Sequence, residues 1–173
     1  MAAISRSRRS TSGIALIVAG ALFILLVLLP LAGVNLPWLA LLASAAMVVA
    51  FVILALGAVN NTVTKIALFA AAAGWAVIAI AGIGLVLPAV LLTLAVVIAA
   101  LAGLVGAIVL YVGKEITNRA GLAFVVATVI GAFYLLNAIG TFGAMGLYVV
   151  VVLLFGAALV VAGVFFRRTG ARR

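Results

Sequence analysis

The residue types that perform acid–base and metal chemistry are nearly absent from this chain. Its 173 residues contain one acidic residue, Glu115, and neither histidine nor cysteine. General acid–base catalysis needs side chains that titrate, and zinc sites are built from Cys, His or carboxylate ligands. We therefore expect no catalytic residue, no metal ligand and no disulfide. No glycine-rich phosphate loop with a following Gly-Lys-Ser/Thr is found either, so the sequence predicts a protein that is not an enzyme and uses no cofactor.

Glu115 itself lies in the segment "YVGKEITNRAG", next to Lys114 and four residues before Arg119. Acidic residues inside apolar spans often serve proton or ion coupling, but this one lies in a charged stretch between two such spans. We interpret it as part of a solvated loop, with a Glu115–Arg119 pair worth a few tenths of a kcal/mol. A gating or coupling role is the alternative.

The composition of the chain predicts that it is embedded in lipid. Hydrophobic residues make up 71% of the sequence and charged residues 6%, whereas a soluble domain carries roughly 25% charged residues. A chain of this length would leave much of that apolar surface in contact with water. A single all-α integral membrane domain is the natural interpretation.

The net charge is +9, and the positions of the basic residues are related to the order of the apolar runs. All basic residues lie at every second boundary between those runs: Arg6, Arg8, Arg9, Lys65, Lys114, Arg119, Arg167, Arg168, Arg172 and Arg173. This is the positive-inside pattern, so we expect both termini in the cytoplasm and a cell inner (plasma) membrane location. The basic tails would rest on anionic lipids, and nucleic acid is not expected as a partner. The excess of arginine over lysine favours a bacterial origin.

The apolar runs are long enough to predict six membrane-spanning helices. We place them at Gly13–Leu31, Trp38–Val59, Ile66–Leu87, Ala89–Val112, Gly121–Ala138 and Ala144–Phe166. Residues 1–12 and 167–173 would be basic cytoplasmic tails flanking a membrane domain at 13–166. The runs lack the alternation of a membrane β-barrel. The first run is interpreted as a retained span, with a cleaved signal peptide as the alternative.

Pairs of spans form three hairpins, at 13–59, 66–112 and 121–166, joined by short outer turns. The motifs "GIAL", "KIAL" and "GLAF" open the first, third and fifth spans, and a glycine follows in each: Gly20, Gly74 and Gly131. This spacing indicates a parallel threefold hairpin repeat. The alternative is that a simple Ala, Val and Leu composition mimics one.

The three-hairpin plan, with glycine in the first helix of a hairpin and Pro37 and Pro88 at outer turns, resembles the HdeD-like acid-resistance membrane protein family. The resemblance covers Gly13 to Phe166, although the third hairpin lacks the outer proline. It implies a bacterial inner-membrane protein linked to stress resistance. It implies no catalytic residues.

Two groups of residues are candidates for specific roles inside the bundle. Small residues at four-residue spacing let helix backbones approach, and the candidates for helix packing are Ala99, Gly103, Ala107, Gly74 and Gly131. Trp75 and Thr128 lie near the middle of their spans, although tryptophan usually prefers membrane interfaces. They are predicted to pack in the interior, with pore lining as the alternative.

These observations predict a non-catalytic integral inner-membrane protein, either stress-related or an accessory or assembly subunit. A membrane protein partner or a second copy of the chain is an expected interaction. The alternative is a small channel or an uncoupled carrier for small neutral or lipidic molecules, because carbonyl groups, glycine and threonine alone can line such a path.

Overall fold

The computed structural model describes residues 6–36, 38–57, 61–83, 87–138 and 145–168. Over these residues the chain is helical, with short connections and no strand. The helices are α1 (Arg6–Leu31), α2 (Trp38–Gly57), α3 (Thr62–Ala81), α4 (Ala89–Val112), α5 (Asn118–Ala138) and α6 (Met145–Arg168). All six are long and apolar enough to cross a membrane. The chain is therefore a multi-pass, all-α membrane protein, as the composition predicts.

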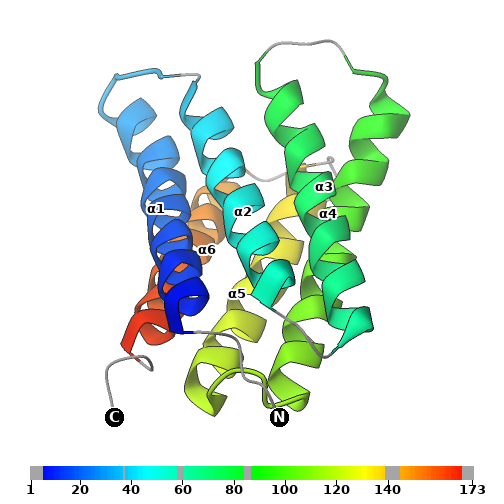
Figure 1. Cartoon of the computed structure of the whole chain (residues 1–173). Helices are drawn as coiled ribbons and strands as arrows, with labels where there is room; N and C mark the ends of the chain where they lie inside the picture. The colour runs from blue at the N-terminus through cyan, green and yellow to red at the C-terminus, as the bar shows by residue number, and fades with distance from the viewer. Residues whose placement is uncertain (1–5, 37, 58–60, 84–86, 139–144, 169–173) are drawn as a thin grey trace.

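The six helices form a closed ring. Each packs against the helices before and after it in the chain, and α1 also packs against α6. Within the described part of the chain no helix approaches a third neighbour, so α1 faces α4, α2 faces α5 and α3 faces α6 across a central axis. Figure 1 shows the start of α1 and the end of α6 side by side at the bottom of the ring.

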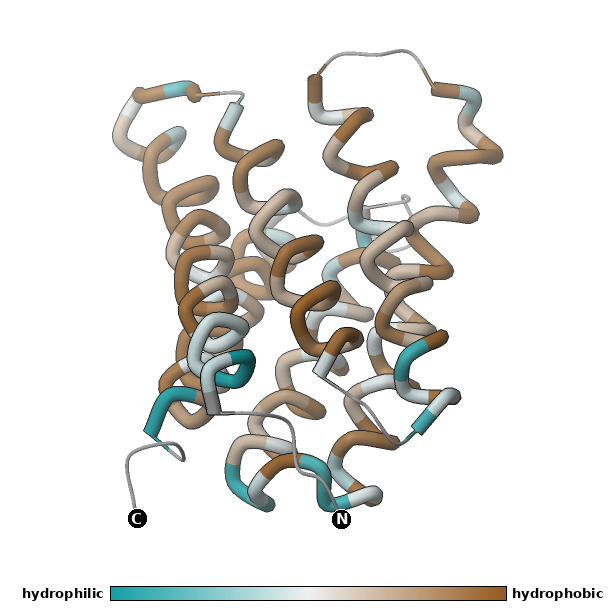
Figure 2. Tube along the Cα trace, in the orientation of Figure 1, coloured by the Kyte–Doolittle hydropathy of each residue, from teal (hydrophilic) through white to brown (hydrophobic). Residues whose placement is uncertain are grey.

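The two ends of the ring differ in polarity. Hydrophilic residues gather where α1 begins and α6 ends, at the bottom of Figure 2. We call this the basic end, because the described lysine and arginine residues belong to it; the other is the distal end. Leucine, isoleucine, valine and phenylalanine side chains are exposed all round the exterior, among them Leu25, Leu101 and Phe133. An apolar exterior of this kind is the surface that lipid requires.

Helices α1, α3, α5 and α6 extend beyond the expected spans at the basic end, whereas α4 ends at the expected Val112. Helix α2 is described to Gly57, and its expected end at position 59 lies outside the described residues. Helix α1 begins at Arg6, inside the segment expected to be a tail, and α6 continues to Arg168. The Arg8 guanidinium donates a hydrogen bond to the carbonyl of Leu56, one of the last carbonyls of α2, which have no partner in their own helix. The Asn61 side chain accepts from the backbone N–H groups of Val63 and Thr64 and caps α3.

At the distal end α3 stops at Ala81, six residues before the expected Leu87. Gly82 forms the C-cap, and α4 starts at Ala89. The connection is therefore longer than the expected span bounds, Leu87 and Ala89, allowed. The apolar character of this segment suggested a longer helix, but Gly82 and Ile83 already lie outside α3, and glycine is a poor helix former.

The end of α1 depends on a glycine in the left-handed backbone conformation. Gly33 has φ of +80°, and the N–H of Val34 donates to the carbonyl of Leu29 at 2.8 Å. A residue with a Cβ would be strained there. This geometry turns the chain towards α2.

Several expectations fall outside the described residues. They concern the proline at position 37, the turns at 84–86 and 139–144, and the C-terminal tail at 169–173. The threefold hairpin repeat also stays a prediction: three hairpins follow one another around the ring, but the glycines at the equivalent positions have different neighbours, as described below.

Candidate functional site

The centre of the ring is filled by aromatic side chains. Phe23, Trp75, Tyr134 and Phe155 come from α1, α3, α5 and α6, and we call them the aromatic layer. The Phe23 ring lies 5.8 Å from that of Trp75 and 5.0 Å from that of Phe155, between ring centroids. Phe155 stacks on Tyr134 with centroids 5.6 Å apart. Since Trp75 and Phe155 belong to opposite helices of the ring, their contact at 6.3 Å crosses the axis.

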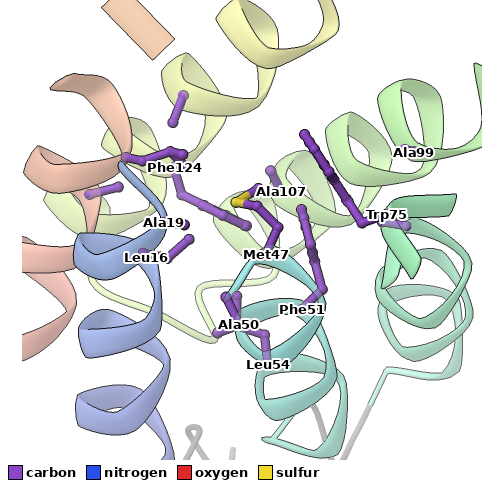
Figure 3. Packing of buried hydrophobic residues seen from close by; sticks show 14 of the residues in the cluster. Leu16, Ala19, Met47, Ala50, Phe51, Leu54, Trp75, Ala99, Ala107 and Phe124 are labelled. Carbon is purple, nitrogen blue, oxygen red and sulfur yellow. The ribbon is translucent and has the colours of Figure 1, made fainter. Parts of the chain in front are cut away.

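A second aromatic cluster lies closer to the basic end. Phe51 of α2 lies 5.9 Å from Phe124 of α5, again across the axis, and Phe124 lies 5.7 Å from Phe166 of α6. Figure 3 shows Met47 and Phe51 lying between Phe124 on one side and Trp75 on the other. The axis of the ring is therefore occupied by side chains at two levels.

The two candidates for pore lining meet at a small cavity between these levels. Trp75 and Thr128 both line a cavity of about 10 Å³, which is the minimum needed to hold one water molecule. Trp75 is 2% exposed, and the Thr128 hydroxyl donates to the carbonyl of Val125 in its own helix at 2.9 Å. In this structure both residues therefore pack in a closed interior, with the threonine hydroxyl satisfied locally.

The candidates for helix packing lie at different kinds of contact. A Cβ added at Gly74 would lie 2.7 Å from the carbonyl oxygen of Ala95 and 2.8 Å from the backbone nitrogen of Ala99, so Gly74 permits close approach of α3 and α4. A Cβ at Gly131 would meet the Phe155 ring at 2.6 Å. Gly103 has more room, with the Phe51 ring at 3.5 Å. Ala107 is fully buried.

A close backbone-to-backbone contact between α1 and α6 was not anticipated from the sequence. Gly13 and Gly20 of α1 lie against Gly163 and Gly156 of α6, and we call these four residues the glycine seam. A Cβ built on any one of them would lie 2.5–2.7 Å from the carbonyl oxygen of its partner. The seven-residue spacing in both helices was the available signal, since seven residues are close to two helical turns.

A larger space inside the ring lies on the distal side of the aromatic layer. This distal cavity has a volume of about 240 Å³ and is bordered by five helices, α1 to α5. Phe23 and Tyr134 of the aromatic layer contribute to its wall, with Leu26, Ile78, Leu92 and Val96. Ser44, which is 5% exposed, adds a hydroxyl. Tyr148 lies beside Tyr134, with ring centroids 6.0 Å apart.

The connection between α4 and α5 covers part of the basic end. Ile116 is 4% exposed and belongs to the hydrophobic core, so the connection folds an apolar side chain back into the ring. Glu115 precedes it and is partly buried. Partial burial raises the pKa of the Glu115 carboxyl above its ordinary value of 4.5, and the charge of Lys65 offsets part of that rise. The cation that acts on Glu115 is thus Lys65 of α3, not Arg119 as the sequence spacing suggested.

Among the described residues no three potential metal ligands of the His, Cys, Asp or Glu types come together. Comparison with known protein families, with curated proteins and with solved structures finds no match to this chain. None of this bears on the resemblance to the HdeD-like family, which stays a prediction. The candidate site that the geometry provides is the distal cavity and the aromatic layer beneath it.

Proposed function

We propose that this chain is a non-catalytic membrane protein that binds a small neutral or lipidic molecule in the distal cavity, as the binding site of an uncoupled carrier. The observation that carries the proposal is the cavity of about 240 Å³ bordered by five helices. A dry cavity of about 150 Å³ is enough to hold benzene or xenon in a protein interior. The space therefore suits a molecule somewhat larger than benzene.

The chemistry of the wall supports a ligand that is mostly apolar. Its side chains are aliphatic or aromatic, apart from the hydroxyls of Ser44 and Tyr134. Small-molecule sites commonly combine an apolar wall with a few polar groups that fix orientation. A ligand with one hydrogen-bonding group on an apolar body fits this arrangement, and an ion does not, because moving a charge into such a wall is costly.

The aromatic layer argues against a permanently open channel. Phe23, Trp75, Tyr134 and Phe155 contact one another across the axis. Passage towards the basic end would require these rings to move apart. Release from the cavity towards the distal side or into the lipid needs no such movement. This arrangement favours a binding protein or a carrier that alternates between states.

Membrane location and sidedness belong to the same proposal. The basic end carries the described arginine and lysine residues, and cytoplasmic segments of membrane proteins carry an excess of them. We therefore place the basic end in the cytoplasm of a bacterial inner membrane, with the distal cavity on the outer side. A reporter fused after Arg173 should behave as cytoplasmic, and periplasmic behaviour would reverse the assignment.

Ligand binding can be tested with a fluorescent aromatic amine, 1-aminoanthracene, added to the full chain in lipid nanodiscs. The Ser44→Leu variant fills the cavity and removes a hydroxyl, whereas Thr93→Leu makes the same chemical change at an exposed position near the distal end of α4. We expect saturable binding to wild type and Thr93→Leu and at least a tenfold weaker affinity in Ser44→Leu, about 1.4 kcal/mol. Equal affinities in all three would contradict the proposal.

The earlier expectation of a stress-related or accessory role is compatible with a binding protein and has its own test. Purification from native membranes in a lipid-preserving system, followed by mass spectrometry, would reveal a stoichiometric partner. Such a partner would make the chain a subunit of a larger assembly. Recovery of the chain alone would leave small-molecule binding as the activity to pursue.

A further inference from the structure

A second site lies on the outside of the ring, between α5 and α6. We call it the α5–α6 groove. It has a volume of about 430 Å³ and is lined by Arg119, Leu122, Ala123, Val126, Ala158, Val161 and Phe165. The alanines leave space between the two helices, and the larger apolar side chains border it. Leu122 is 54% exposed and Val161 is 49% exposed, so the groove opens towards the lipid.

The groove is apolar along its length and cationic at one end. Arg119 is the second residue of α5 and therefore lies at the basic end of the bundle. Arg168 is exposed and follows Phe165 by three residues on α6, so it lies on the same helix face one turn further towards the basic end. An apolar groove that ends at two guanidinium groups near a membrane interface is complementary to a phosphate with an attached acyl chain.

The protein itself supplies no acidic side chain to pair with Arg119. Glu115 is the single acidic residue of the chain, and the cation that acts on it is Lys65, on α3. The charge of Arg119 is thus available to an external anion. The chain has a net charge of +9. This positive charge repels a lipid headgroup that carries a positive group of its own.

We propose that the α5–α6 groove binds one anionic phospholipid, with an acyl chain between α5 and α6 and its phosphate at Arg119 and Arg168. This site is independent of the distal cavity, because the two share no lining residue. It differs from diffuse attraction of the basic tails to the membrane surface, since both a headgroup contact and a fitted acyl chain are required. It holds for either orientation of the chain in the membrane.

The test is native mass spectrometry of the full chain with an equimolar mixture of dioleoylphosphatidylglycerol and dioleoylphosphatidylcholine. We expect wild type to retain one phosphatidylglycerol in preference to phosphatidylcholine. Arg119→Gln should lower that retention about fivefold, the factor associated with one arginine near an anionic surface. Ala158→Leu, which fills the groove and leaves its charges in place, should lower retention of the same lipid by a similar factor.

Two matched controls separate the groove from general effects. Arg167→Gln removes a charge from the same turn of α6, but Arg167 lies against α1, where its Cγ would be 3.1 Å from a Cβ at Gly13. Ala157→Leu adds the same bulk at an exposed neighbour of Ala158. Neither control should change lipid retention. All variants are compared by circular dichroism, and Ala123→Leu replaces Ala158→Leu if the latter does not fold.

Three results would overturn the proposal. Equal losses in Arg119→Gln and Arg167→Gln would mean diffuse charge attraction. Unchanged retention when the groove is filled at Ala158 or Ala123 would mean that no acyl chain lies there. Equal retention of the two lipids by wild type would remove the headgroup preference.

Discussion

Gly20 of α1 and Gly156 of α6 lie so close that a Cβ on Gly20 would be 2.5 Å from the Gly156 carbonyl oxygen, and a Cβ on Gly156 would be 2.7 Å from that of Gly20. Gly13 and Gly163 repeat this reciprocal contact one heptad away. The first and last helices of the chain are therefore joined by backbone-to-backbone packing. In lipid, where apolar side chains gain little by leaving solvent, such close packing is a main source of helix association.

This contact gives a prediction for alanine at the seam. Gly20→Ala should destabilise the protein by about 1–3 kcal/mol, because the added methyl group meets backbone atoms that can yield only if the helices separate. Gly103→Ala is the matched control, since its Cβ would have ordinary contact with the Phe51 ring at 3.5 Å. There alanine should be neutral or stabilising, as it favours the helix by up to about 1 kcal/mol over glycine. Reversible unfolding in mixed detergent micelles measures both free energies, and an equal response of the two variants would argue against the seam.

The aromatic layer gives a second prediction. Trp75→Ala should lower the free energy of unfolding by about 3–5 kcal/mol, the usual cost of removing a large buried aromatic side chain. Trp75→Phe should cost less, because a phenyl ring keeps part of the contact with Phe23 and Phe155. The same unfolding assay measures both variants. A Trp75→Ala protein as stable as wild type would mean that Trp75 faces lipid and not the axis.

The environment of Glu115 predicts how stability depends on pH. Because partial burial raises the carboxyl pKa in the folded protein above 4.5, the folded state binds this proton more tightly than the unfolded state. The stabilisation from this group is present below pH 4.5 and is lost as the pH rises through the raised pKa. Wild type should therefore lose stability relative to Glu115→Gln over that interval. Thermal unfolding of both proteins across the acidic range measures the difference, and parallel profiles would contradict the assignment.

Lys65 supplies a further check on the same group. Its positive charge lowers the Glu115 pKa and so acts against the effect of burial. Lys65→Met should move the pH-dependent loss of stability to higher pH. Lys114→Met is the control, because Lys114 does not contribute to the shift although it adjoins Glu115 in the sequence. Equal displacement by the two variants would mean that Lys65 has no special relation to Glu115.

The sequence predicts the fold well wherever hydropathy is the deciding quantity. Six apolar runs became six helices, and Trp75, unusual for its distance from the interface, lies at the centre of the ring. The predicted positions of the helix ends were less accurate. Hydropathy marks where lipid begins, whereas α1 remains helical through its arginines back to Arg6 because helix formation does not require lipid.

The arrangement of helices was harder to predict than their existence. The small residues at Ala99, Gly103 and Ala107 were singled out by four-residue spacing, while Gly13 and Gly20 were noted only as parts of the hairpin repeat and not as packing residues. Their importance depends on which helix lies opposite, and a sequence alone does not say that α1 meets α6. The distal cavity was missed for the same reason, because its wall combines residues from five helices.

The closed ring is the central claim, because the distal cavity lies among helices that the ring brings together. The α5–α6 groove needs only the packing of those two helices. The chain has no cysteine. Any disulfide within a double variant therefore joins the two introduced cysteines. Ile17 and Val160 lie beside the glycine seam, Ile17 against Gly163 and Val160 against Gly20. Copper-phenanthroline oxidation of the Ile17→Cys, Val160→Cys double variant in membranes should give a high yield of the intramolecular disulfide. The Ile17→Cys, Ala102→Cys variant, which pairs α1 with α4 across the axis, should give none. Cross-linking to α4 without cross-linking to α6 would contradict the ring.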